Sequence, residues 1–420
     1  MTGFDLAVIG LGYVGMPLAK EAVAAGLRVV GVDVDSSKID ALNAGRSYID
    51  DLTDADLEHM LANGFVATAD ESVLAASSTI VICVPTPLDE DHRPDLSAVE
   101  SATAAAARNL SAGTLVVLES TTWPGTTDEI ARPLLETSGL VAGVGFFLAF
   151  SPERIDPGNT KYGMRNTPKV VGGYTATCRD RATAFYSQFV EQVVPVSGTR
   201  EAEMAKLLEN TYRHVNIALV NEMAIFCDEL GIDLWESIEA AATKPFGFQK
   251  FLPGPGVGGH CIPVDPSYLS YAVRKLGYPF RFVELAQEIN ERMPSYVVAR
   301  VQRLLNRHKL PVNGSKVVML GVTYKPDIAD ERETPALPVA RSLLELGAEL
   351  TFVDPYVKHW AVDGTSVPRE EDLAEAVLNA DVTLLMQQHA LFDLAMVEEK
   401  ARLVLDTRGV LAEGARVERL

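Results

Sequence analysis

Residues 5–15, which read "DLAVIGLGYVG", decide the fold of the first part of this chain. An apolar run ends at Gly10, and Gly12 and Gly15 follow where an amphipathic segment begins. Glycines at this spacing between a strand and a helix let the backbone and the helix N-terminus approach a pyrophosphate. A second apolar run at 28–35 completes the pattern. The stretch therefore predicts a βαβ unit that binds a dinucleotide.

The second strand of this unit carries the residue that selects the cofactor. Asp33 stands at its end, where a carboxylate accepts hydrogen bonds from the adenosine ribose hydroxyls and disfavours a 2′-phosphate. We therefore expect NAD rather than NADP. Tyr13 and Val14 lie in the glycine turn and belong to the same expected site. Lys38 has two interpretations, a contact to the pyrophosphate or ribose, or an ordinary solvated lysine.

Three further apolar runs indicate more parallel strands, at 78–87, 113–126 and 144–154. Each run breaks into Thr, Pro or charged residues at its carboxyl end, and ligands bind at that edge of an open parallel sheet. The candidates that this position suggests are Pro85, Thr86, Thr121 and Glu153. For each single residue, a turn or capping role is the competing interpretation.

The rest of the chain predicts a long helix and a second sheet. Residues 200–231 have helical periodicity and place Lys206, Asn210 and Arg213 on or near one face. After a linker at 310–316 the opening pattern returns without its glycine turn, and Asp354 takes the place that Asp33 has in the first half. The second half could bind a different nucleotide, or it could only cap the first.

We therefore expect an α/β protein with two Rossmann-like, doubly wound parallel-sheet domains, joined by a helical middle domain with a long central helix. The expected boundaries are 1–198 for the N-terminal NAD-binding domain, 199–310 for the central helical domain, and 311–420 for the C-terminal Rossmann-like domain.

The bulk composition restricts the partners. The chain has 420 residues and a formal net charge of −20, which disfavours nucleic acid and anionic membranes. We expect a cytoplasmic location, because the N-terminus lacks a basic segment with a cleavage site and the longest apolar run is too short to span a bilayer. The cysteines lack metal-ligand or disulfide spacing, so no metal is expected, and Cys83, Cys178 and Cys227 are expected to be core thiols.

Residues 254–266, "GPGVGGHCIPVDP", hold the fourth cysteine in an unusual setting. Glycine and proline disfavour the interior of a helix or strand, so a loop is expected here. Cys261 could be a small buried residue in a tight turn, or a nucleophile whose backbone lies flat against a ligand, with Asp265 four residues later. We expect His260 to be a loop contact and not a partner base.

The motifs, taken together and in order, resemble the UDP-glucose/GDP-mannose dehydrogenase family over essentially the whole chain. They are "GLGYVG", "VPTP", "ESTTWPGTT", "SPERIDPG", "KLLENTYRHVNIALVNE", "GPGVGGHCIPVDP" and "GVTYKPDIADERETP". The resemblance implies oxidation of the C6 hydroxyl of a nucleotide sugar to a carboxylate, with two NAD reduced per turnover and no release of the aldehyde. It also implies a homodimer or higher homo-oligomer paired through the central helical domain, and a C-terminal domain that binds a UDP-sugar.

Within this family, "SPERIDPGN", "TPKVVGG" and "AATKPFGF" are most similar to the UDP-N-acetylglucosamine 6-dehydrogenase branch. The UDP-glucose branch has a second glutamate where this chain has Pro157, which weakens a UDP-glucose assignment. UDP-N-acetylmannosamine and UDP-N-acetylgalactosamine stay open as substrates. Two other functions also stay open, a two-electron hydroxyacid dehydrogenase that needs no cysteine, and a catalytically silent nucleotide-sugar sensor.

The resemblance implies a role for each catalytic candidate. Cys261 traps the aldehyde as a thiohemiacetal that is oxidised to a thioester. Lys206 stabilises the oxyanions at C6, while Asp265 and Asn210 position water. Glu153 is the candidate base for thioester hydrolysis, and Thr121 holds a water or the nicotinamide ribose. The first alcohol proton goes either to Lys206 or to a water bound to Asp265.

The resemblance also implies binding residues in the second half of the chain. Arg332 is an expected NAD contact, and Lys325 and Arg408 are expected UDP-sugar contacts. Arg154 and Arg213 are expected to read the phosphates or the acetamido group. The remaining expected substrate contacts are Glu153, Lys206, Asn210 and the backbone amides of Gly256, Gly258 and Gly259.

Overall fold

The computed structural model describes the chain except for residues 1–2, 50–51, 90–92, 157–158, 160 and 260, and except for the side chains of Cys261 and Pro263. The expectations for Pro157 and His260 and for the Cys261 thiol therefore fall outside the described residues. The chain divides into two compact units, one formed by Met1–Glu209 with Ser267–Tyr278 and the other by Asn210–Pro266 with Pro279–Leu420.

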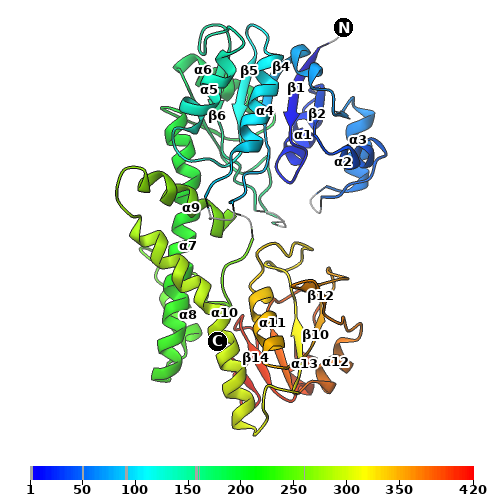
Figure 1. Cartoon of the computed structure of the whole chain (residues 1–420), viewed down its shortest axis with the longest axis vertical. Coiled ribbons are helices and arrows are strands. Elements are labelled where there is room, and N and C mark those ends of the chain that lie inside the picture. Colours follow the sequence, from blue (N-terminus) through cyan, green and yellow to red (C-terminus); the bar gives the residue numbers. More distant parts are fainter. Residues whose placement is uncertain (1–2, 50–51, 90–92, 157–158, 160, 260) are drawn as a thin grey trace. The chain divides into compact units, whose positions relative to one another are not determined.

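The first unit contains an eight-stranded sheet in the order β3-β2-β1-β4-β5-β6-β7-β8 (Figure 1). Its first six strands follow the Rossmann order 3-2-1-4-5-6, and all neighbours are parallel except β6 and β7. The strands are β1 (Phe4–Ile9), β2 (Val29–Val32), β3 (Val66–Thr68), β4 (Ser77–Ile82), β5 (Leu115–Leu118), β6 (Phe147–Phe150), β7 (Lys169–Gly173) and β8 (Val193–Val196).

Helices cover this sheet because its central strands are apolar on both faces. Every residue of β2, β5 and β6 is buried, as expected for a parallel sheet packed on both sides. The helices are α1 (Gly15–Ala24), α2 (Ser36–Asn43), α3 (Asp54–Ala62), α4 (Ser97–Arg108), α5 (Arg132–Glu136) and α6 (Ala176–Tyr186), with short turns η1 (Glu71–Ala76) and η2 (Thr127–Ala131).

The second unit contains a parallel five-stranded sheet in the order β10-β9-β13-β14-β15. Numbered along the chain, the strands have the order 2-1-3-4-5 of a doubly wound sheet. The strands all run parallel, but β10 is added on one side of β9 and β13 and the later strands on the other. The strands are β9 (Lys316–Leu320), β10 (Glu349–Val353), β13 (Val382–Leu385), β14 (Val404–Asp406) and β15 (Val417–Arg419), beside a small hairpin of β11 (Ala361–Val362) and β12 (Thr365–Ser366).

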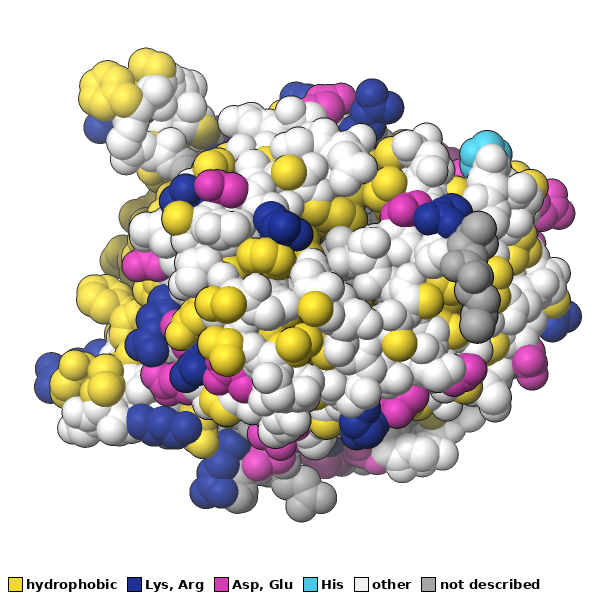
Figure 2. All heavy atoms as spheres, turned by 90° about the horizontal axis from the view of Figure 1, so that it is seen from above, with side chains coloured by type: hydrophobic (Ala, Val, Ile, Leu, Met, Phe, Trp, Pro, Cys, Tyr) yellow, Lys and Arg dark blue, Asp and Glu magenta, His cyan; other side chains and the backbone are white. Residues whose placement is uncertain are grey.

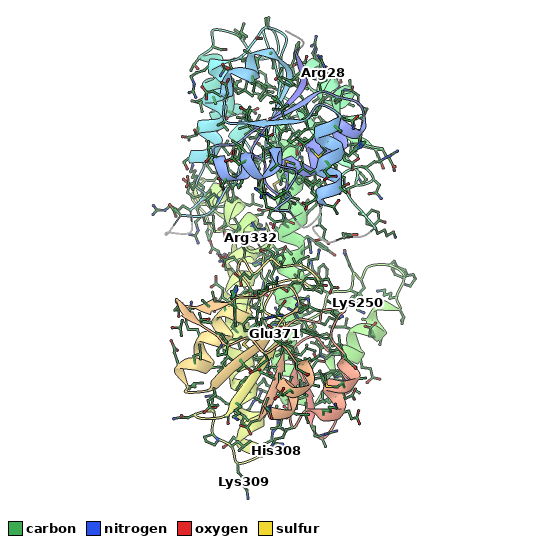
Figure 3. All side chains as sticks on the ribbon, turned by 90° about the vertical axis from the view of Figure 1, so that its right-hand side faces the viewer. Arg28, Lys250, His308, Lys309, Arg332 and Glu371 are labelled. Carbon is green, nitrogen blue, oxygen red and sulfur yellow. The ribbon has the colours of Figure 1, made fainter. Side chains whose placement is uncertain are left out.

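The helices of the second unit are α8 (Leu234–Ala242), α10 (Arg281–Arg307), α11 (Ala336–Glu345), α12 (Leu373–Asn379) and α13 (Leu394–Lys400). Helix α8 is tied to the end of the chain, since the indole N–H of Trp235 donates to the carbonyl of Leu420 at 3.0 Å. Figure 3 shows Arg332 at one end of this unit and His308 and Lys309 at the other. The loop that follows β9 and the linker that precedes it therefore lie at opposite ends.

Two helices contribute to both units. The long helix α7 (Thr199–Leu230) passes from the first unit to the second after Glu209, and α9 (Cys261–Arg274) returns to the first unit at Ser267. The expected fold, two doubly wound sheets with a long helix between them in the sequence, is confirmed.

The expectation of a loop throughout 254–266 is wrong in its second half, because α9 begins at Cys261. The N–H groups in the first turn of a helix have no acceptor within the helix, so a proline such as Pro263 loses no hydrogen bond there. Pro266 lies farther inside the same helix.

The surface mixes charges of both signs. Figure 2 shows Lys and Arg side chains interspersed with Asp and Glu over one face of the protein. Exposed ion pairs such as Arg108–Glu71, at 2.8 Å, are of this kind. Among the described helices, none combines the length and the apolar character that crossing a bilayer requires.

Candidate active site

The glycine turn after β1 is built as the sequence predicts. Gly10 has φ +95°, and a Cβ there would lie 2.6 Å from the carbonyl oxygen of Cys83. A Cβ on Gly15 would lie 2.0 Å from the carbonyl oxygen of Gly10, so α1 can approach the turn only without a side chain. A Cβ on Gly12 meets nothing within 4 Å. The packing of the protein itself requires Gly10 and Gly15 but not Gly12, where a pyrophosphate contact stays a prediction.

Asp33 closes the same turn from the end of β2. One carboxylate oxygen accepts the N–H of Leu11 at 2.9 Å, and the other accepts the N–H of Asp35 at 3.0 Å. Each oxygen keeps a lone pair that a ribose hydroxyl could use. Tyr48, which the sequence did not indicate, donates its hydroxyl to the carbonyl of Leu11. Its pKa is raised by burial and by the charges of Asp33 and Asp35, so it stays a hydrogen-bond donor.

The other expected cofactor residues lie around this edge of the sheet. The ammonium of Lys38 lies 6.0 Å from the ring centre of Tyr48, which places it beside the turn. Thr86 is buried, Thr121 is half-buried and Pro85 is exposed. The three expected core thiols, Cys83, Cys178 and Cys227, are buried, which confirms that expectation.

The segment 267–278 holds the ends of β4 and β5. Tyr268 is fully buried, and its hydroxyl donates to the carbonyl of Thr86 at 2.9 Å. The ring of Trp123 lies 5.4 Å from that of Tyr271. Lys275 places its ammonium 4.9 Å from the Trp123 ring centre, within cation–π distance. The sequence does not predict this aromatic anchor, because nothing local links these residues to the strand ends.

A buried lysine lies behind Glu153. The ammonium of Lys169 lies 3.0 Å from one oxygen of Glu119 and 3.5 Å from Glu153, and Tyr186 donates its hydroxyl to Glu119. Burial raises the pKa of Glu119. Burial alone would lower the pKa of Lys169, but the charges of Glu119 and Glu153 outweigh it and raise that pKa. The three groups form one interdependent charged cluster.

The carboxylate of Glu153 also accepts the backbone N–H groups of Arg154 and Ile155, at 2.6 and 2.5 Å. Lys206, on the first part of α7, donates to the backbone carbonyl of Glu153 at 2.6 Å. The guanidinium of Arg154 pairs with Glu209 at 2.7 Å. The structure therefore brings Glu153, Arg154 and Lys206 together, and their expected roles stay predictions.

Glu203 on α7 fixes the loop that follows Thr121. Its buried carboxylate accepts the N–H of Gly125 at 2.6 Å, and the N–H and hydroxyl of Thr127 at 2.9 and 2.7 Å. Burial raises the pKa of Glu203 to about 7. The sequence does not predict a role for Glu203, because a glutamate in a polar stretch of helix usually faces solvent.

In the second unit, Asn210 donates to the carboxylate of Asp265 at 2.5 Å, and both side chains are buried. These residues were expected to hold water together, and the structure brings them into contact across α7 and α9. Arg213, expected on the same face of α7, is exposed. Asn221 is buried and accepts the N–H of Gly254 at 2.9 Å.

The glycines of the segment 254–259 pack against the protein itself. A Cβ on Gly258 or Gly259 would lie 2.6 Å from the side chain of Tyr324, and one on Gly256 would lie 3.3 Å from Pro335. The N–H of Gly259 donates to the carbonyl of Arg332 at 3.1 Å. The absence of side chains is thus explained by close packing, and a substrate contact at Gly256 or Gly258 stays a prediction.

Three expected cations lie around this segment. Arg408 places its guanidinium 3.2 Å from a Cβ built on Gly254, and donates to the carbonyl of Met386 at 2.7 Å. Lys325 follows Tyr324 directly and is half-buried. Arg332 is exposed and pairs with Asp330 at 2.6 Å. The second unit therefore groups Lys325, Arg332 and Arg408 near the glycine-rich segment.

The second sheet repeats the carboxylate geometry of the first. Asp354 accepts the N–H of Val322 at 2.8 Å and that of Tyr356 at 2.8 Å, as Asp33 accepts Leu11 and Asp35. Unlike Asp33, it is fully buried, and Nε2 of His389 lies 3.1 Å from it. A ribose cannot reach this carboxylate. Asp354 therefore does not have the ribose-binding role that is expected of Asp33.

Comparison with known proteins gives a consistent result for all three parts of the chain. The sequence pattern of the UDP-glucose/GDP-mannose dehydrogenase family matches residues 4–190 as its NAD binding domain, 200–292 as its central domain and 318–413 as its UDP binding domain. UDP-N-acetyl-D-mannosamine dehydrogenase of Yersinia pestis is 35% identical over 424 residues, covering 96% of this chain and 98% of that protein.

Two further similarities are informative. UDP-N-acetyl-D-glucosamine 6-dehydrogenase of Pseudomonas aeruginosa is 35% identical over 359 residues, covering 85% of this chain and 84% of that protein. The solved structure of UDP-D-ManNAc dehydrogenase from Pyrococcus horikoshii superposes with a TM-score of 0.89 at 33% identity, covering 99% of this chain and 98% of that one.

Proposed function

The chain belongs to the UDP-glucose/GDP-mannose dehydrogenase family, and we propose that it oxidises the C6 hydroxyl of a UDP-N-acetylhexosamine to the uronic acid in two steps. The expectations of an NAD-dependent nucleotide-sugar dehydrogenase and of a UDP-sugar substrate are confirmed at the level of the family. The observation that carries the two-step proposal is the buried Asn210–Asp265 pair, since Asp265 lies one turn after Cys261 on α9.

Cys261 is proposed as the nucleophile. It is the first residue of α9, and the partial positive charge of a helix N-terminus favours a thiolate there. Bound NAD supplies a hydride acceptor for each oxidation. Between the two oxidations, the Cys261 sulfur adds to the aldehyde carbon to give a thiohemiacetal. The second oxidation converts this thiohemiacetal into a thioester.

The remaining residues are proposed to move protons and water. Asn210 and Asp265 hold the water that attacks the thioester carbonyl, so that the carboxylate product leaves and the thiol is regenerated. Glu153 takes the proton of that water, and Lys206 stabilises the oxyanion at C6. The first alcohol proton goes to Lys206 or to a water on Asp265. Thr121 holds a water or the nicotinamide ribose.

The binding residues divide between the two units. The glycine turn at Gly10, Gly12 and Gly15 is proposed to hold the pyrophosphate, and Asp33 the adenosine ribose, which favours NAD over NADP. Arg332 is a further proposed NAD contact. Lys325 and Arg408 are proposed for the UDP-sugar, and the position of Arg408 beside Gly254 supports its part in this assignment.

UDP-N-acetylglucosamine is our first candidate among the isomers, because of the motifs shared with that branch. UDP-N-acetylmannosamine is the second candidate, favoured by the relative that covers 96% of the chain at 35% identity. The two differ at one stereocentre.

The test is the number of NADH formed per sugar nucleotide consumed, with the N-acetylglucosamine, N-acetylmannosamine, N-acetylgalactosamine and glucose forms of the UDP-sugar. Two NADH per sugar in the wild type, lost in Cys261→Ser and kept in the control Cys227→Ser, is the expected result. One NADH per sugar would contradict the thioester route, and no NADH with any sugar would favour a silent sensor.

We also propose that the chain has three domains, 1–198, 199–310 and 311–420. Two copies of the chain are proposed to pair through α7. Exposed apolar side chains recur along this helix at Leu208, Tyr212, Leu219, Phe226 and Leu230. Such a stripe on a helix is typical of a protein–protein interface. Light scattering coupled to size exclusion should give a dimer or a multiple of it, and Leu219→Glu should dissociate it.

A further inference from the structure

The loop after β13 carries a buried histidine that the proposed chemistry does not use. His389 is 2% exposed, and its ring lies between those of Tyr356, at 5.1 Å, and Phe392, at 5.2 Å. Its Nδ1 accepts the backbone N–H of Asp327 at 2.9 Å, and its Nε2 lies 3.1 Å from Asp354. Because Nδ1 is the acceptor, the proton lies on Nε2 and is donated to Asp354.

The loop at 322–328 is held by these contacts and not by a strand ladder. Asp327 accepts the N–H of Ala390 at 2.8 Å, so the two loops exchange hydrogen bonds at His389 and Asp327. Asp327 has φ +62°, in the left-handed region that non-glycine residues adopt infrequently, although Asp does so more often than most. Inside the same loop, the hydroxyl of Thr323 donates to the carbonyl of Lys325 at 2.8 Å.

The comparison with the first sheet shows what His389 replaces. Asp33 and Asp354 make the same pair of backbone contacts after equivalent strands, but only Asp33 keeps part of its surface open. At Asp354 the imidazole takes the place that a ribose hydroxyl would need. The carboxylate that selects a cofactor in the first unit is thereby used in the second unit to anchor a loop.

We propose that His389 is a positioning residue for the UDP-sugar. It connects Asp354 to the backbone of Asp327, and so fixes the loop that carries Lys325. The inference rests on the proposed function through one assignment, Lys325 as a contact of the UDP moiety. His389 itself touches no substrate in this scheme. It acts on affinity for the nucleotide sugar and leaves the NAD turn in the first unit unaffected.

Three substitutions separate the contributions of the ring. His389→Phe keeps the packing between Tyr356 and Phe392 but removes both hydrogen bonds. His389→Asn keeps an acceptor near the position of Nδ1, whereas His389→Gln keeps a donor near the position of Nε2. His359→Phe, at an exposed histidine of the same unit, is the matched control.

The measurement is calorimetric binding of UDP and of NAD to the full-length protein, with Lys325→Ala as the reference for the site. We expect His389→Phe and His389→Gln to weaken UDP binding on the order of tenfold, with NAD affinity unchanged within about twofold. His389→Asn should stay within about threefold of the wild type, because it still accepts the N–H of Asp327. Thermal unfolding identifies any variant that fails to fold. If His389→Phe does, the loss of UDP affinity in His389→Gln relative to His389→Asn carries the test.

Two results would overturn the inference in distinguishable ways. If Lys325→Ala weakens UDP binding while all three His389 variants bind UDP like the wild type, the positioning role is wrong and the proposed UDP site stands. If Lys325→Ala binds UDP like the wild type, the assignment of Lys325 fails and the role of His389 fails with it. Equal losses of UDP and NAD affinity in His389→Phe would show a merely structural role.

Discussion

Replacing Lys169 by methionine tests the charged cluster behind Glu153. Methionine keeps most of the side-chain length but removes the ammonium from between Glu119 and Glu153, where Lys169 and Glu119 are 4% and 2% exposed. Removing one partner of a buried ion pair costs about 3–5 kcal/mol, because the other charge stays buried without compensation. We expect a loss of this size in the free energy of unfolding at pH 8.

The loss of stability should depend on pH, because Glu119 can take up a proton and so avoid a buried charge without a partner. Keeping a carboxyl protonated costs about 1.4 kcal/mol for each pH unit above the ordinary glutamate pKa. The loss in the free energy of unfolding cannot exceed this cost, which is about 5 kcal/mol at pH 8 and about 1 kcal/mol at pH 5. Because burial raises the pKa of Glu119, the variant keeps its stability at low pH, where Glu119 is protonated. It loses stability as the pH rises and the buried carboxyl must either ionise or hold a proton against the solution. The variant should therefore approach the wild type at pH 5.

The assay is urea unfolding at pH 5 and pH 8, followed by circular dichroism and tryptophan fluorescence. Lys20→Met is the matched control, since Lys20 pairs with Asp56 at 2.9 Å on the surface and should contribute less than about 1 kcal/mol. The double variant Lys169→Met/Glu119→Gln should recover part of the loss. A Lys169→Met variant within about 1 kcal/mol of the wild type at pH 8, or one more strongly destabilised at pH 5 than at pH 8, would refute the reasoning.

Three other predictions concern Glu203, Gly12 and Gly15 of the first unit. Burial raises the pKa of Glu203 to about 7, so the native state keeps a proton that the unfolded chain has lost above pH 4.5. Stability should fall by up to about 3 kcal/mol as pH rises from 4.5 through 7, and urea titrations of Glu203→Gln should lack this slope. Gly12→Ala should leave unfolding unchanged but raise KM for NAD at least about tenfold, because its Cβ meets only the space proposed for the pyrophosphate. Gly15→Ala should also lose about 1–3 kcal/mol of stability, since its Cβ would collide with Gly10, and equal stability of the two variants would contradict this account.

The amino-acid sequence alone determined the parts of this protein that depend on local spacing. The turn from Gly10 to Gly15 and its partner Asp33 were predicted correctly, because a strand, a tight turn and a helix fix their relative positions within one βαβ unit. The two doubly wound sheets were predicted because buried parallel strands read as continuous apolar runs. Asn210 and Asp265 were expected together from the family resemblance, and the structure joins them.

Only the tertiary structure decided which distant side chains meet. Lys169 lies on β7 and reaches Glu119 beyond β5, and no pattern along the chain shows that these strands bring the two charges together. The start of α9 at Cys261 was missed, because glycine and proline indicate a loop wherever their neighbours are unknown, and a helix tolerates proline in its first turn. Asp354 has the same place in its sheet as Asp33, and its different role comes from His389, which is 35 residues away along the chain. His389 follows β13, which is separated from β10 by β9 in the sheet. Local spacing fixes turns and strands, whereas the environment of a buried charge depends on contacts between segments that only the folded chain brings together.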